Sequence, residues 1–348
     1  MKKTKLTLLL IISTLLQTKA QEFDGIFEGG IEDATTYLQA YANPLMQSLS
    51  NGLGNGWYNT AKPHKLLGFD LTITVNVVNV SSSERKFTFD ENDYQNLELA
   101  SGNPNLPSAV GGSSDTRIRA VAGRTISDGS NTITIEEAEE FDAPDGFDVE
   151  DLPIINGLPV PALQLGIGLP KNTDLKLRYA SDFGAFDDGN LAFYGIGVLH
   201  DVKQWIPGLR QIPFDFAGFV GYTFLDADYE IEEGSASSDY QADGEIEIGV
   251  YSFTIQGIVS KKLSIFTPYL GLGYTISGSD LNVNGDFIYR EGSTELTFAD
   301  PVSLDFDGGS TYKINAGLRI KLAILTLHAE YVLQESDVFT VGIGFSVR

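Results

Sequence analysis

The side chains that could carry chemistry are few and widely spaced in this 348-residue chain. It contains no cysteine and three histidines, His64, His200 and His328, which form no short metal-binding motif. The lack of cysteine excludes thiol catalysis, cysteine-ligated metals and disulfides. An outer-membrane lipase would need a serine and a histidine aligned at the lipid surface, whereas His328 is expected to face inward. We therefore expect no metal, no cofactor and no enzymatic activity.

Charged residues recur at alternate positions of three predicted strands. They are Asp174, Lys176 and Arg178 in the first, Lys313, Arg319 and Lys321 in the second, and His328 and Glu330 in the third. Alternate positions of a strand share one face, so His328 and Glu330 could pair with the bases of the neighbouring strand. Such a polar face indicates either a pore lining that selects solutes or a salt-bridge ladder that fills a lumen.

Acidic residues outnumber basic ones by 47 to 23, for a formal net charge of −24. Nucleic-acid binding needs a basic surface, so this class of partner is excluded. Nine of the sixteen residues in 136–151 are acidic, but they lack the spacing of a calcium-binding loop. This run is interpreted as a solvated loop, with divalent ions shared with lipopolysaccharide phosphates as the alternative.

The N-terminus predicts export. Residues 1–20 combine a basic start (Lys2, Lys3 and Lys5), an apolar run over 6–16 and small residues before Gln21, as in a cleaved signal peptide. Residues 21–65 form the next unit, and the composition of 31–50 predicts one or two short helices interrupted at Pro44.

Residues 66–348 show a period of two, which indicates β-strands. The alternating stretches run about 9 to 12 residues, near the length that crosses a bilayer at a tilt. Short connections, such as 170–172, alternate with long polar ones, above all 81–158. The fold class is therefore all-β, a transmembrane antiparallel β-barrel, with a soluble secreted β-protein as the alternative. Trp205, Tyr331 and Phe345 are predicted interface aromatics.

The number of strands is expected to be even and between 10 and 14. The clear strands number ten, and twelve are favoured if 281–290 and 295–306 also cross the membrane. A hairpin of 117–122 with 132–137 would raise the count to fourteen.

Three segments carry a resemblance to known proteins. They are 56–65 (GWYNTAKPHK), 164–171 (QLGIGLPK) and 203–208 (KQWIPG). With them the chain resembles a family of exported Gram-negative proteins that is grouped with membrane β-barrels and has no assigned activity. The layout is also similar, more distantly, to outer-membrane long-chain fatty-acid transporters, in which a helical N-terminal segment plugs the lumen before the barrel begins. Trp57, Tyr58, Asn59, Lys62 and His64 would belong to that plug, with Thr60 standing where those transporters usually have proline.

These observations lead to two functional hypotheses. The first is an outer-membrane channel for passive passage of a small or hydrophobic solute. The second is a non-transporting surface barrel that binds a partner or acts in adhesion through its acidic loops. Expected partners are outer-membrane lipid, lipopolysaccharide and the barrel assembly machinery.

Overall fold

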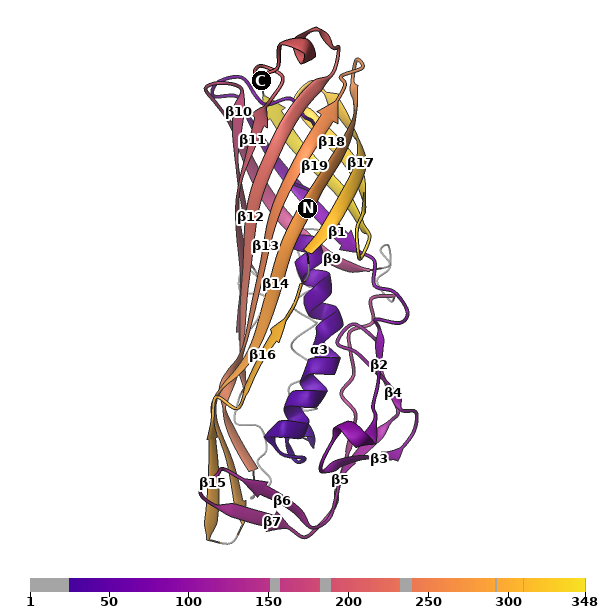
Figure 1. The fold of residues 1–348 in the computed structure, drawn as a ribbon, viewed down its shortest axis with the longest axis vertical. Coiled ribbons are helices and arrows are strands. Elements are labelled where there is room, and N and C mark those ends of the chain that lie inside the picture. The colour runs from indigo at the N-terminus through magenta and orange to yellow at the C-terminus, as the bar shows by residue number, and fades with distance from the viewer. Residues whose placement is uncertain are drawn as a thin grey trace, which may run out of the picture.

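A computed structural model describes residues 25–150, 157–181, 189–231, 240–291, 293–308 and 310–347. The predicted signal peptide lies outside these residues. Ten antiparallel strands close into a barrel through the pairing of β1 with β19 (Figure 1). In order around the barrel they are β1 (Phe69–Val78), β9 (Leu158–Leu169), β10 (Thr173–Ser181), β11 (Gly189–Asp201), β12 (Asp215–Ile231), β13 (Tyr240–Ser260), β14 (Phe266–Glu291), β17 (Ser310–Leu322), β18 (Leu325–Leu333) and β19 (Val338–Val347).

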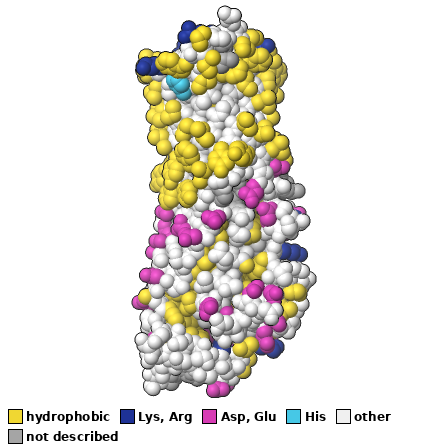
Figure 2. Space-filling model, in the orientation of Figure 1, with side chains coloured by type: hydrophobic (Ala, Val, Ile, Leu, Met, Phe, Trp, Pro, Cys, Tyr) yellow, Lys and Arg dark blue, Asp and Glu magenta, His cyan; other side chains and the backbone are white. Residues whose placement is uncertain are grey.

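One end of the barrel carries an apolar belt on its outer surface. On β14 the outward residues Phe266, Leu270, Leu272 and Ile276 are 42–61% exposed. Figure 2 shows hydrophobic side chains covering the upper half of the molecule and acidic ones scattered over the lower half. A continuous exposed apolar surface of this kind matches lipid rather than water. On β14 the belt extends over about 11 residues, the length needed to cross a bilayer.

Beyond the belt the polarity of the strands inverts. On β12 the outward residues change from Phe224 to Asp226, while the inward residue Leu225 is buried. Asp226 is in register with Gly249 on β13, which is in register with Asp280 on β14. The three strands therefore leave the membrane at one level and continue as a sheet with an apolar inner face and a polar outer face, as in a water-soluble protein.

The two additional segments that favoured twelve strands do not form new crossings. Residues 281–290 continue β14 beyond the belt, and 294–306 forms β15 (Thr294–Ala299) and β16 (Val302–Phe306). Both short strands pair with this outer part of β14. The sheet thus has twelve strands, of which ten close the barrel.

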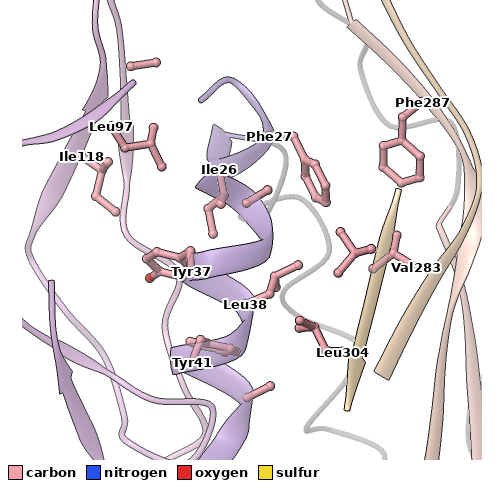
Figure 3. Close-up of a cluster of buried hydrophobic side chains, with 14 of the residues drawn as sticks. Ile26, Phe27, Tyr37, Leu38, Tyr41, Leu97, Ile118, Val283, Phe287 and Leu304 are labelled. Carbon is pink, nitrogen blue, oxygen red and sulfur yellow. The ribbon is translucent and has the colours of Figure 1, made fainter. Parts of the chain in front are cut away.

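Helix α3 (Ile31–Leu53) stands outside the belt, between the extended sheet and the long β1–β9 connection (Figure 1). Pro44 lies inside this single 23-residue helix, so the expected interruption is wrong. Tyr37, Leu38 and Tyr41 point into a hydrophobic cluster that α3 shares with both neighbours (Figure 3). Burial of this amphipathic helix against two surfaces outweighs the local cost of the proline.

The long connection is built from small sheets around α3. Its elements are β2 (Lys86–Thr88), η1 (Glu91–Asp93), β3 (Leu97–Ser101), β4 (Asn105–Pro107), β5 (Arg117–Ala120), β6 (Arg124–Ser127), β7 (Thr132–Ile135) and β8 (Glu139–Asp142). Strand β5 pairs with β3 and β8, whereas β6 pairs with β7. The expected barrel hairpin of 117–122 with 132–137 is therefore wrong, because both of its strands pair within the connection.

The opposite end of the barrel carries the tight turns, the start of β1 and the end of β19. Lys171 and Asn172 adopt positive φ in the three-residue turn 170–172 between β9 and β10. Helix η2 (Pro207–Gln211) lies in the connection between β11 and β12 at this end. We call it the short-turn end and the other the distal end. No helix within the described ranges is long and apolar enough to cross a membrane.

Candidate functional site

The lumen is occupied by residues 54–65, which we call the plug segment. It follows α3 and runs along the barrel axis to the start of β1. Its contacts with the wall fall at three levels, and a buried basic or acidic side chain of the wall takes part at each.

At the level nearest α3, Lys313 of β17 holds the plug segment. Its Nζ donates to the Gly54 carbonyl at 2.8 Å, to Asn55 Oδ1 at 3.1 Å and to Thr254 Oγ1 at 3.3 Å. The Lys313 side chain is fully buried, so these acceptors replace the water that its ammonium group loses. The lysine thus binds the plug segment rather than the neighbouring Glu330.

At the middle level, Trp57 fills the centre of the lumen. It is 2% exposed, with the Arg178 guanidinium 3.7 Å from its ring centroid and the Phe219 ring 5.3 Å away. The wall makes room through glycines, because a Cβ at Gly195 would lie 2.9 Å from the indole and one at Gly221 3.0 Å. The Trp57 carbonyl accepts from Gln164 Nε2 at 3.1 Å. Trp57 is therefore held in place through both its ring and its backbone carbonyl.

Tyr58 anchors the other side of this level. Its hydroxyl donates to Asn315 Oδ1 at 3.0 Å, and Asn315 Nδ2 donates to Glu330 Oε2 at 2.6 Å. The Tyr58 ring meets the buried Tyr269 ring edge-on at 6.0 Å. Tyr269, at 2% exposed, therefore belongs to the lumen.

At the level nearest the short-turn end, His64 joins three strands. Its backbone N–H donates to Asp174 Oδ1 at 2.7 Å, and its Nδ1 lies 2.8 Å from Asp174 Oδ2. The Nε2 lies 3.2 Å from Ser346 Oγ and 3.6 Å from Asp70 Oδ1. Asp70 is also 3.7 Å from Lys176 Nζ. The end of the plug segment is thus tied to β1, β10 and β19.

The structure places the predicted lumen residues as follows. Asp174, Lys176, Arg178, Lys313, Arg319, His328 and Glu330 are 1–6% exposed, whereas Lys321 is half-buried and its Nζ donates to the Ser346 carbonyl at 2.8 Å. His328 lies opposite Arg319 in the β17–β18 register, where two bases do not form an ion pair. Of the plug residues, Trp57, Tyr58 and His64 are buried, Asn59 is half-buried and Lys62 is exposed.

The predicted interface aromatics lie on the outer surface. Trp205, Tyr331 and Phe345 are 47–62% exposed. The Trp205 indole N–H donates to His200 Nε2 at 2.7 Å, beside η2 at the short-turn end.

Sequence reasoning missed Asp70, Gln164 and Ser346 as partners of the plug segment. Each sits at an alternate, polar position of a strand, which signals only that it faces the lumen. Gln164 and Ser346 contact plug residues 107 and 282 positions away, and these contacts depend on the barrel closing around the plug segment.

One described cluster has the donor types of a cation site. Ligand atoms of His64, Asp70 and Asp174 all lie within 4.8 Å of one another. The ammonium group of Lys176 already supplies positive charge beside Asp70, and Asp174 is fully engaged by His64. This geometry suits a hydrogen-bonded anchor better than a dication site, because a second cation beside Lys176 would be repelled.

Solved structures that are similar to this chain include three bacterial proteins. The translocator domain of autotransporter NalP from Neisseria meningitidis is 9% identical, with a TM-score of 0.30 over 90% of this chain and 98% of that chain. The transport unit of autotransporter AIDA-I from Escherichia coli is 8% identical, with a TM-score of 0.33 over 89% and 99%. The outer membrane protease OmpT from Escherichia coli is 7% identical, with a TM-score of 0.26 over 80% and 94%. Such identities bear on the fold alone.

A search of curated proteins gives no match. One family model matches residues 1–347, that is, nearly the whole sequence. The matched residues include the plug segment, the barrel and the long connection. The chain therefore belongs to DUF6588, a family of unknown function.

Proposed function

We propose that this protein is a plugged, non-conducting outer-membrane barrel that supports an ordered layer outside the membrane and binds a partner or ligand there. The observation that carries this proposal is the filled lumen. A channel needs a water-filled path, whereas here Trp57, Tyr58 and His64 are at most 4% exposed within the barrel.

The distal end supports the same proposal. Strands β12, β13 and β14 have 17, 21 and 26 residues, well beyond the belt, and enclose α3 together with the long connection. This extension contains a buried hydrophobic cluster of its own, so it is an ordered structure rather than a set of solvated loops. An ordered surface of this kind suits binding or adhesion better than it suits passage of solutes.

The outer face of this extension is acidic. Cross-strand register places Asp228 opposite Glu247 and Asp280 opposite Asp305. Burial and the neighbouring Asp305 raise the pKa of Asp280. Like charges at paired positions repel, so this face favours basic or cation-bridged partners such as lipopolysaccharide.

A catalytic role is not part of the proposal. Asp174, His64 and Ser346 stand in the order of a hydrolase triad, but Ser346 is 1% exposed and lies beneath the plug segment. Its Oγ also accepts from Lys321 Nζ at 3.2 Å. A fluorophosphonate probe should therefore leave Ser346 unlabelled; labelling that is lost in Ser346→Ala would point to an enzyme instead.

Conductance separates this proposal from the channel hypothesis, which stays a prediction. Purified protein is placed in planar bilayers and in solute-loaded liposomes, with a variant lacking residues 25–60 as the opened barrel. The unaltered protein should show neither conductance steps nor flux, and the deletion variant should conduct. Steady conductance or solute flux from the unaltered protein would reject the plugged barrel.

Location and partners are tested by fractionation. The apolar belt predicts that the protein stays with outer membranes after carbonate washing and migrates faster on detergent gels before heating. Depletion of the barrel assembly machinery should prevent the compact, fast-migrating form. Recovery in the soluble fraction would reject the membrane location.

A further inference from the structure

The N-terminal part of the chain lies in order along β14. Phe27, just before α3, packs on Phe287 with ring centroids 5.2 Å apart. Gly54, just after α3, lies against Thr275, and Tyr58 lies against Tyr269. The 12 residues between Thr275 and Phe287 span about 40 Å, and a 23-residue helix is about 35 Å long. Helix α3 therefore stands upright outside the belt, with its first residues farthest from it.

The path of the chain crosses the whole belt. Leu53 ends α3 just inside the distal mouth of the barrel, where its carbonyl accepts from Arg178 and Thr223, and Phe69 begins β1 at the short-turn end. Bacterial barrels keep short turns in the periplasm and extended loops outside. On the outer-membrane location proposed above, α3 lies outside the cell and β1 begins on the periplasmic side.

We infer that this barrel passes its own N-terminal segment outward through its lumen and retains it there, so that α3 is displayed on the cell surface. The barrel is then a conduit for a single polypeptide cargo, a part of its own chain. This rests on the membrane orientation in the proposed function and goes beyond it in naming what the lumen carries.

The dimensions give the order of events. The plug segment lacks regular helix, and its central Trp57 already requires glycines in the wall. A helix with side chains is about 10–12 Å across. Helix α3, with Tyr37 and Tyr41 locked into the cluster of Figure 3, is thus too wide for a lumen that an extended chain fills. The segment crosses extended, and α3 folds afterwards.

The folded segment is then held from both sides. On the distal side, Tyr289 of β14 donates a hydrogen bond to the Phe27 carbonyl, and α3 is buried between the extended sheet and the long connection. On the short-turn side, Asp174 holds His64. Neither end can slip through the barrel without breaking buried contacts.

The cysteine-free sequence allows a direct test. Single cysteines are introduced as Glu32→Cys in α3 and Lys62→Cys in the plug segment, both at exposed positions. Thr132→Cys in β7 and Lys171→Cys in the β9–β10 turn report the two sides of the membrane independently. Intact cells are treated with a membrane-impermeant maleimide, before and after the outer membrane is opened, and folding is checked by migration without heating.

In intact cells, Glu32→Cys and Thr132→Cys should be labelled as fully as in opened cells. Lys62→Cys and Lys171→Cys should be labelled only after opening. Suppose that the reporters Thr132→Cys and Lys171→Cys are labelled as expected but Glu32→Cys is labelled only after opening. The inference that α3 is displayed outside would then be wrong, while the orientation of the barrel would stand. If Lys171→Cys is labelled in intact cells and Thr132→Cys only after opening, the orientation itself is wrong and the inference is wrong with it. Neither outcome depends on conductance, so failure of the plugged-barrel proposal is seen separately.

Discussion

Replacing Trp57 by alanine should release the plug segment while leaving the barrel closed. The indole is 2% exposed and packs against Arg178 and Phe219. Truncating a buried aromatic to alanine costs about 3–5 kcal/mol, because the transfer free energy is lost and a cavity remains. The surrounding strands are held by their own ladders, so most of this cost should fall on docking of the plug segment.

A cysteine at position 60 measures that docking. Thr60 is 7% exposed, so Thr60→Cys should react slowly with maleimide in the docked state. If reaction follows opening of the plug segment, a loss of about 3–5 kcal/mol raises the rate by about 100- to 4000-fold, since 1.4 kcal/mol is a factor of ten. The rates are compared in detergent-solubilised, folded protein.

The other tryptophan provides a matched control. Trp205 is 62% exposed at the short-turn end, so Trp205→Ala makes the same chemical change away from the lumen and should leave the rate unchanged. Equal rates for Trp57→Ala and the parent, in barrels that both migrate as folded, would refute the assignment of Trp57 as the plug's anchor.

Three further changes test other parts of the structure. Gly195→Val should also speed labelling, because a Cβ there would lie 2.9 Å from the indole of Trp57 and displace it; thermal unfolding of the barrel is the accompanying measurement. Lys313→Met should raise the labelling rate about 5- to 150-fold, since it leaves buried acceptors without a donor at about 1–3 kcal/mol; an unchanged rate would show that the lysine does not hold the plug. Burial and Asp305 raise the pKa of Asp280, so the folded state binds protons more readily than the unfolded chain. The stabilisation of the folded state by protonated Asp280 is therefore present below the unfolded pKa of about 4 and is lost as pH rises through the folded pKa. Amide protection factors, which remove the intrinsic pH dependence of exchange, should be higher at pH 4 than at pH 7.5 in the distal part of β14, and Asp280→Asn should reduce that difference.

The barrel strands could be predicted because their alternation is local. In β19, Phe339, Val341 and Ile343 face lipid while Thr340 and Gly342 face the lumen, and a period of two is visible in any short window. The inversion beyond the belt was harder to recognise. On β14 the period continues through 276–283 while the apolar side changes, so the sequence alone suggested a separate strand where one strand leaves the membrane.

The lumen contacts could be predicted only in part. Alternation indicates that Asp174, Lys176 and Arg178 share a face, but not what they touch. Arg178 stacks on an indole more than 120 positions earlier, and Lys313 donates to backbone 259 positions earlier. The expected pairing among neighbouring strands was the simplest solution for charges in a closed lumen, and the plug segment replaced it.

The sequence by itself determined the class of the protein, because signals such as strand period, strand length and turn composition are written in adjacent residues. Only the tertiary structure decided that ten strands close, that Gly195 and Gly221 make space for Trp57, and that α3 stands outside a lumen filled by its own chain. The physical reason is that these features depend on closure, which brings distant residues together, and local periodicity carries no record of which distant residue will fill a given space.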